Sequence, residues 1–138
     1  MTVVHLVATL FMVGVIVFVQ VVHYPLMERV GGDAFVNYQA GHVVRTGVVV
    51  VPPMIAEVGS AVWLFAGMAR GSSEWMVALL GLVLLAVIWL STAFLQAPAH
   101  GRLESGFNPS VHRALVRWNW LRTAAWLGRV PVAVMLLN

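Results

Sequence analysis

The chain carries five histidines, and imidazole side chains can bind metal ions or transfer protons near neutral pH. His23 ends the first apolar segment, His42 precedes the second, His100 follows the third and His112 precedes the fourth. Imidazoles that converge from helix ends are common ligands of iron, copper and zinc, and of haem iron. These four histidines therefore predict a metal site, with iron or copper ahead of zinc, or a haem site. The alternative is that they cap helices or bind linker carbonyls.

Two charged residues, Glu57 and Arg122, stand inside otherwise apolar segments. A charge at the centre of a bilayer costs roughly 2.5–3.5 kcal/mol, so neither residue is expected to face lipid. We predict that Glu57 forms an ion pair with Arg122 or with Arg129. Together with Asn119, Glu57 and Arg122 are predicted to form a catalytic network that orients substrate or relays protons. The alternative is that the ion pair only holds the helices together.

Several aromatic and amide side chains accompany these residues, and we predict that they contact a substrate. They are Tyr24, Tyr38, Gln96, Trp89 and Trp126. A buried indole or phenol offers a flat apolar face together with one hydrogen-bond donor, which suits a lipophilic molecule. Simple packing of the two tryptophans is the alternative interpretation.

Each apolar segment has one stripe of polar residues at helical spacing, and such stripes turn away from lipid. The stripes are His5, Thr9, Met12, Ile16, Gln20 and His23; His42, Thr46, Val49, Pro53, Glu57 and Ser60; Trp89, Thr92 and Gln96; and His112, Leu115, Asn119, Arg122, Trp126 and Arg129. They predict a polar interior that holds water or a ligand at one end of a helical bundle.

The composition places this bundle in a membrane. Of 138 residues, 61% are hydrophobic and only 9% are charged, with a mean hydropathy of +0.91. A soluble domain of this length cannot bury so much apolar surface. The net charge of +3 comes from scattered arginines, which argues against a nucleic-acid partner. Cysteine is absent, so disulfides, thiolate nucleophiles and cysteine-bound metals are excluded.

We predict an all-α, up-down bundle of four transmembrane helices in a single domain, residues 1–138, with spans at about residues 3–24, 43–68, 75–97 and 110–137. Pro25 and Pro98 are predicted to end two spans, leaving linkers at residues 27–41 and 98–109. Asn108-Pro109 is predicted to cap the last helix. The linkers carry more arginine than the opposite end, so both termini are predicted on the extracytoplasmic side of a bacterial inner (cytoplasmic) membrane.

Residues 18–26, 46–57, 91–100 and 119–123 resemble a family of uncharacterised bacterial four-span membrane proteins. Pro98–Leu103, followed by Trp118-Asn119-x-x-Arg122, is more loosely similar to anthrone-oxygenase-like integral membrane proteins, in which Asn usually stands at the position of His100. The second resemblance implies oxidation of a hydrophobic, aromatic or polyketide-like substrate.

The leading hypothesis is therefore a small integral-membrane oxidoreductase that acts on a lipophilic substrate at a histidine-lined, metal-dependent site near the cytoplasmic face. Two alternatives stay open: a non-enzymatic haem- or quinone-binding subunit, and a module that binds or transports a lipid or metabolite. Membrane lipids and a lipophilic small molecule are the expected partners, and a thin four-span bundle also favours a homo-oligomer.

Overall fold

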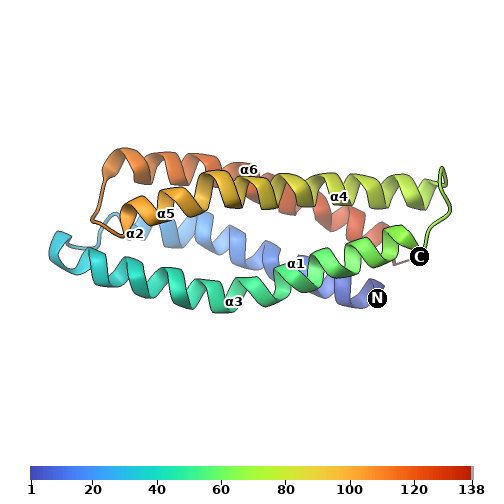
Figure 1. The fold of residues 1–138 in the computed structure, drawn as a ribbon, viewed down its shortest axis with the longest axis horizontal. Helices are drawn as coiled ribbons and strands as arrows, with labels where there is room; N and C mark the ends of the chain where they lie inside the picture. Colours follow the sequence, from blue (N-terminus) through green and yellow to red (C-terminus); the bar gives the residue numbers. More distant parts are fainter. Residues whose placement is uncertain (138) are drawn as a thin grey trace.

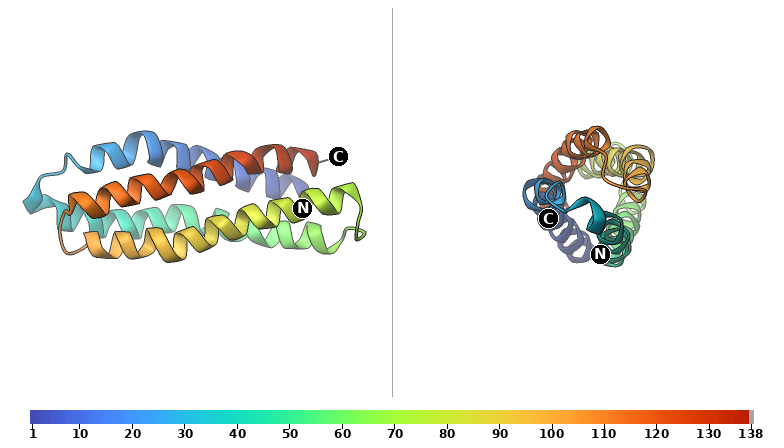
Figure 2. Two further views of the ribbon diagram at one scale, coloured as in Figure 1. Left: turned by 90° about the horizontal axis from the view of Figure 1, so that it is seen from above. Right: turned by 90° about the vertical axis from the view of Figure 1, so that its left-hand side faces the viewer.

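The structure is a computed structural model that describes residues 1–137, and the regular structure of these residues is entirely helical. Four helical rods run antiparallel in chain order, and both termini lie at the same end of the bundle (Figure 1). Seen end-on, the rods stand at the corners of a square (Figure 2). The predicted all-helical, up-down arrangement is confirmed.

The first rod contains α1 (Thr2–Phe18), the π-helical segment η1 (Val19–His23) and α2 (Tyr24–Met27). The second rod is α3 (Gly32–Ala66). The third contains α4 (Ser73–Ser91), the π-helical segment η2 (Thr92–Gln96) and α5 (Ala97–Leu103), and the fourth is α6 (Pro109–Met135).

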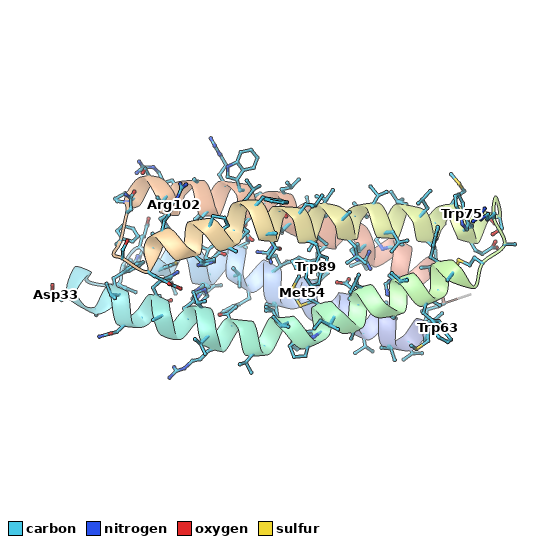
Figure 3. All side chains as sticks on the ribbon, in the orientation of Figure 1. Asp33, Met54, Trp63, Trp75, Trp89 and Arg102 are labelled. Atoms are coloured by element: carbon cyan, nitrogen blue, oxygen red, sulfur yellow. The ribbon has the colours of Figure 1, made fainter. Side chains whose placement is uncertain are left out.

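Three of these rods are long and apolar enough to cross a membrane: Thr2–Met27, Gly32–Ala66 and Ser73–Leu103. The fourth, α6, is 27 residues long and packs against α1 and α4, but its arginines set it apart from the other three. Large apolar side chains cover the outside of the bundle, which suits contact with lipid rather than water. Trp63 and Trp75 lie at the end that carries the termini, and Asp33 and Arg102 lie at the opposite end (Figure 3).

The prediction that Pro25 and Pro98 end two spans is wrong, because each helix continues past its proline. Proline has no N–H and its ring clashes with the carbonyl four residues earlier. In both rods a π-helical turn precedes the proline: Tyr24 N–H donates to the carbonyl of Val19, and Ala97 N–H donates to that of Thr92. The wider turn displaces the carbonyls with which the ring would collide.

The predicted linkers are consequently too long. Residues 32–41 belong to α3, which is one uninterrupted helix containing Pro52 and Pro53, and residues 97–103 belong to α5. Only residues 28–31 and 104–108 connect the rods at this end, which we call the linker end. The predicted cap of the last helix is confirmed, since the side chain of Asn108 accepts hydrogen bonds from the N–H groups of Ser110 and Val111.

Three apolar clusters fill the interior. One near the linker end includes Tyr24, Phe35 and Leu115, and one near the termini includes Ala78 and Val132. The middle cluster is built on Met12, Ile16, Met54, Ile88 and Trp126. Polar side chains fill the spaces between these clusters. These buried polar side chains make up the candidate site.

Candidate functional site

A cavity of about 330 Å³ lies between the rods and extends from the linker end toward the middle of the bundle. We call it the linker-end cavity. Met12 and Ile16 of α1 and Val43 and Val50 of α3 form an apolar wall. The polar groups on its lining come from all four rods and from the connection at residues 104–108, and they are Tyr24, His42, Thr46, Thr92, Gln96, His100, Glu104 and Arg122. Its volume falls in the range of small-molecule sites, which are mostly apolar with few polar groups.

His100 is fixed by two side chains at the linker end. Gln39 Nε2 lies 3.0 Å from His100 Nδ1 and also donates to the His100 carbonyl at 3.2 Å. A carbonyl only accepts hydrogen bonds, so Gln39 presents its NH₂ group here and His100 Nδ1 must be an acceptor. His100 Nε2 therefore carries the proton and donates to the Tyr24 hydroxyl oxygen at 3.1 Å. The hydroxyl hydrogen of Tyr24 is left to donate to another group.

His42 and His23 form a stack at the edge of the cavity. Their ring centroids are 4.3 Å apart and their planes differ by 21°. His42 Nδ1 pairs with Thr46 Oγ1 at 3.0 Å, and the His42 ring lies 5.2 Å from that of His100. His23 and Tyr38 face a separate surface groove beside His42 rather than the cavity itself. His42 thus lies between the cavity and this groove, because it lines both.

Arg122 and Gln96 supply the polar groups farther from this end. Arg122 Nη1 donates to Asn119 Oδ1 at 3.1 Å, and Asn119 Nδ2 donates to Gln20 Oε1 at 2.8 Å. Arg122 Nε finds no hydrogen-bond partner in the described part of the protein, nor does either amide atom of Gln96. Gln96 is 2% exposed and Arg122 is 9% exposed, so both are buried polar groups. Such groups are usually hydrogen-bonded. Gln39 Oε1 and His23 Nε2 are the other buried side-chain atoms without a partner among residues 1–137, but neither side chain is on the cavity lining.

A second polar cluster lies nearer the termini, and we call it the Glu57 cluster. Arg129 Nε donates to Glu57 Oε1 at 2.8 Å, which confirms one of the two predicted ion pairs. Thr9 donates to the same oxygen at 2.7 Å, and the Trp126 indole donates to Oε2 at 3.1 Å. Arg129 also donates to the Gly81 carbonyl and approaches His5 Nε2 at 3.2 Å. All four rods contribute, so the cluster ties the bundle together.

The structure separates the three residues that were predicted to be catalytic. Arg122 lines the cavity, Asn119 holds Arg122 from behind, and Glu57 is enclosed with both oxygens engaged by the protein. Trp126 connects the two regions, because its ring lies 5.2 Å from the Arg122 guanidinium while its N–H binds Glu57.

Among the residues predicted to contact substrate, Tyr24 and Gln96 line the cavity, Tyr38 faces the neighbouring groove and Trp126 lies in the core. Trp89 is 38% exposed on the outside of α4 and is not among the residues that line the cavity. Sequence reasoning missed Gln39, which is fully buried and orients His100. Its position three residues before His42, on the same helical face, is the signal that could have revealed it.

The predicted metal centre is not supported by the arrangement of the histidines. No group of three or more His, Asp or Glu side chains among residues 1–137 is placed to hold one metal ion. Both ring nitrogens of His100 are hydrogen-bonded, and His112 Nε2 donates to the Tyr24 carbonyl at 2.9 Å. The stacked rings of His23 and His42 lie nearly parallel, an arrangement that does not aim their nitrogens at a shared ion. The donor set therefore fits neither a metal centre nor bis-histidine haem ligation.

Comparisons with protein-family models, with curated proteins and with solved structures found no match to this chain.

Proposed function

We propose that this protein binds a lipophilic small molecule with a polar, oxygen-bearing headgroup in the linker-end cavity. The observation that carries the proposal is the cavity's two-sided lining. Apolar side chains of α1 and α3 would receive the apolar part of the ligand, while Tyr24, Gln96 and Arg122 offer hydrogen-bond donors to its headgroup. Tyr24 has a donor hydrogen to spare, and Gln96 and Arg122 have buried donors with no partner in the protein.

A glycine on the cavity wall allows a direct test. Gly47 lines the cavity, and a Cβ added there would have no atom within 4 Å. Gly47→Leu should therefore fold normally and fill the cavity with its side chain. Gly59→Leu is a matched control, because Gly59 lies on the same helix, is exposed and also has open space around an added Cβ.

The assay would measure saturation binding of radiolabelled decanol to purified protein in lipid nanodiscs, with empty nanodiscs as the background. We expect close to one site per chain in the wild type and in Gly59→Leu, and at least a tenfold loss of affinity in Gly47→Leu. Equal binding by all three proteins would contradict the proposal, because the ligand would then lie outside the cavity.

For the membrane topology, we propose that α6 is a fourth span and that the linker end faces the cytoplasm of a bacterial cell. The two deep arginines of α6 are buried in the bundle, so its charge does not meet lipid. Arg29, Arg45, Arg102, Arg113 and Arg117 lie toward the linker end, against Arg70 at the other end. This asymmetry supports a cytoplasmic linker end under the positive-inside rule.

The absence of cysteine makes the topology simple to measure. Single cysteines at Gly71 and at Ser105, both on exposed connections, would be labelled with a membrane-impermeant maleimide in intact cells. We expect labelling at position 71 and none at position 105 until the cells are lysed. The reverse pattern would contradict the orientation, and labelling of both positions in intact cells would contradict the single span, Ser73–Leu103, that separates them.

Proton-transfer catalysis on the bound molecule is a second candidate, favoured by the Tyr24–His100 hydrogen bond on the cavity wall. Tyr24 would pass its hydroxyl proton to the ligand oxygen, and the Nε2–H of His100, which donates to the Tyr24 oxygen, would stabilise the negative charge left on that oxygen. The oxidoreductase hypothesis stays a prediction, and in the described residues this pair is its main support. Turnover of a phenolic substrate that is lost in Tyr24→Phe and kept in Tyr38→Phe would favour catalysis over binding alone.

A further inference from the structure

Two arginines of α6 are buried, but only one has a counter-ion. Arg129 and Glu57 are both 0% exposed and form the one ion pair found among residues 1–137. Arg122, two turns earlier, is bonded through Nη1 to the neutral amide of Asn119, and its Nε has no hydrogen-bond partner. The ring of Trp126, 5.2 Å away, offsets only part of the charge. Arg122 is thus a buried cation that lacks a protein carboxylate.

A buried charge without a counter-ion is strongly unfavourable, because hydration is lost and nothing replaces it. The unpaired charge of Arg122 on the cavity lining is explained if a bound ligand supplies the negative charge that the protein does not. A second observation points the same way. Gln96, 2% exposed and on the same cavity lining, has neither amide atom bonded within the described protein.

We propose that the ligand of the linker-end cavity is an amphiphilic monocarboxylate, with its carboxylate held by Arg122 and Gln96 and its apolar part against α1 and α3. A guanidinium presents parallel N–H donors that match the two oxygens of a carboxylate. The inference rests on the proposed binding function and specifies the class of ligand.

Charge and size narrow the class further. One arginine balances one negative charge, and the Glu104 carboxylate on the cavity lining repels a dianion, such as a phosphate monoester, about twice as strongly as a monoanion at the same place. At roughly 30 Å³ for a water-sized group, a cavity of about 330 Å³ holds on the order of ten such groups. A medium-chain fatty acid or a substituted aromatic acid has this size, whereas a two-chain phospholipid does not fit.

The test compares decanoate with decanol, which has the same chain length and no charge, by saturation binding in nanodiscs. We expect the wild type to bind decanoate at least tenfold more tightly than decanol. Arg122→Gln should abolish this preference while decanol binding changes less than threefold. Arg113→Gln is the control, because Arg113 lies exposed on the same helix and should keep the preference.

The failures of the two proposals are distinguishable. If decanol binds but decanoate binds no more tightly, or if Arg122→Gln keeps the preference, the carboxylate inference is overturned and the cavity remains a binding site. If neither compound binds, both proposals fail. Displacement of decanoate by millimolar chloride, with decanol unaffected, would overturn the amphiphile assignment in favour of a simple inorganic anion.

A stability measurement separates a ligand-binding arginine from a structural one. If Arg122 is held for a ligand, replacing it with Gln or Met removes an uncompensated charge and should raise the melting temperature of the ligand-free protein. Added decanoate should then stabilise the wild type and not the variants. A lower melting temperature for both variants, with no loss of decanoate stabilisation, would overturn the inference.

Discussion

Arg129 Nε lies 2.8 Å from Glu57 Oε1 in a region where both side chains are fully buried. This ion pair joins α6 to α3, and the remaining bonds of the two residues reach α1 and α4. The donors and acceptors of the pair are matched within the protein, which is the arrangement that makes a buried charge tolerable. We therefore expect the Glu57 cluster to contribute to stability, since Glu57 does not line the linker-end cavity and reaches it only through Trp126.

Neutralising Glu57 should destabilise the fold. Glu57→Gln keeps the shape of the side chain but leaves Arg129 as an unpaired buried cation, so we expect a loss of about 3–5 kcal/mol in the free energy of unfolding. Thermal unfolding in detergent or nanodiscs would measure the change. Glu74→Gln, on an exposed residue in the first turn of α4, removes only a favourable charge at a helix N-terminus and should cost much less stability than Glu57→Gln.

A double variant makes this prediction specific to the ion pair. Glu57→Gln combined with Arg129→Met removes both charges, so it should be more stable than Glu57→Gln alone. Equal destabilisation by the single and double variants would show that shape, rather than charge, dominates the Glu57 cluster.

Gly81 should be intolerant of even a methyl group. Its carbonyl accepts a hydrogen bond from Arg129, and a Cβ would lie 3.0 Å from Cγ1 of Val132 and 3.6 Å from Nη1 of Arg129. We expect Gly81→Ala to cost about 1–3 kcal/mol through overpacking. Gly14→Ala, on an exposed face of α1 with no atom within 4 Å of the added Cβ, should gain up to about 1 kcal/mol from helix propensity. Thermal unfolding of both variants would reveal opposite signs.

The two buried clusters should hold their histidines in opposite tautomers. Arg129 can only donate to His5 Nε2, so His5 carries its proton on Nδ1 and donates to Ser60 Oγ at 3.0 Å. His100 carries its proton on Nε2, as does His112, which donates to the Tyr24 carbonyl. Nitrogen-15 NMR of histidine-labelled protein would distinguish the tautomers, with His5→Gln and His100→Gln assigning the signals. Identical tautomers for His5 and His100 would contradict the deduced networks.

The stripes predicted from helical spacing match the interior closely in two rods. Every residue of the stripe on α6, from His112 to Arg129, is buried, and so are the α1 and η1 positions from His5 to Gln20. These helices are regular over most of their length, so steps of three and four track one face. A buried polar residue on such a face was therefore identifiable from sequence alone.

The prediction fails where the helical period changes. In η2 the buried positions step from Ser91 to Gln96, five residues apart, so counting back from Gln96 in steps of three and four reaches exposed Trp89. In η1 the face passes from Gln20 to Tyr24, and His23 is only half-buried. Pro25 and Pro98 indicated that the regular α-helix is interrupted. A proline after a π-helical turn and a proline at the end of a helix cannot be told apart from the sequence.

The site itself depends on contacts that periodicity does not encode. Gln39 meets His100 across 61 positions of sequence, and the stacking of His23 on His42 joins two different rods. The four histidines at one end were predicted to be metal ligands, yet His42, His100 and His112 direct ring nitrogens to Thr46, Gln39, Tyr24 and the Tyr24 carbonyl. The types of the residues and their positions along the predicted helices indicated where the polar site lies. What the site can bind depends on the hydrogen-bond partners of its side chains, which only the structure shows.

Removing the extra residue of η2 should test the origin of this change in period. Deletion of Ala93 together with Pro98→Ala turns the five-residue step from Ser91 to Gln96 into a four-residue step. The residues before and after the deletion should then still point to the same sides of the rod, with Ser91 and Gln96 toward the interior. We expect the double change to fold with a modest loss of stability. Deletion of Val83, an exposed residue in regular α4, should instead rotate one half of the rod by about 100° and unfold the bundle. Thermal unfolding and decanol binding would compare the two deletions, and equal damage by both would contradict a role for η2 in placing Gln96.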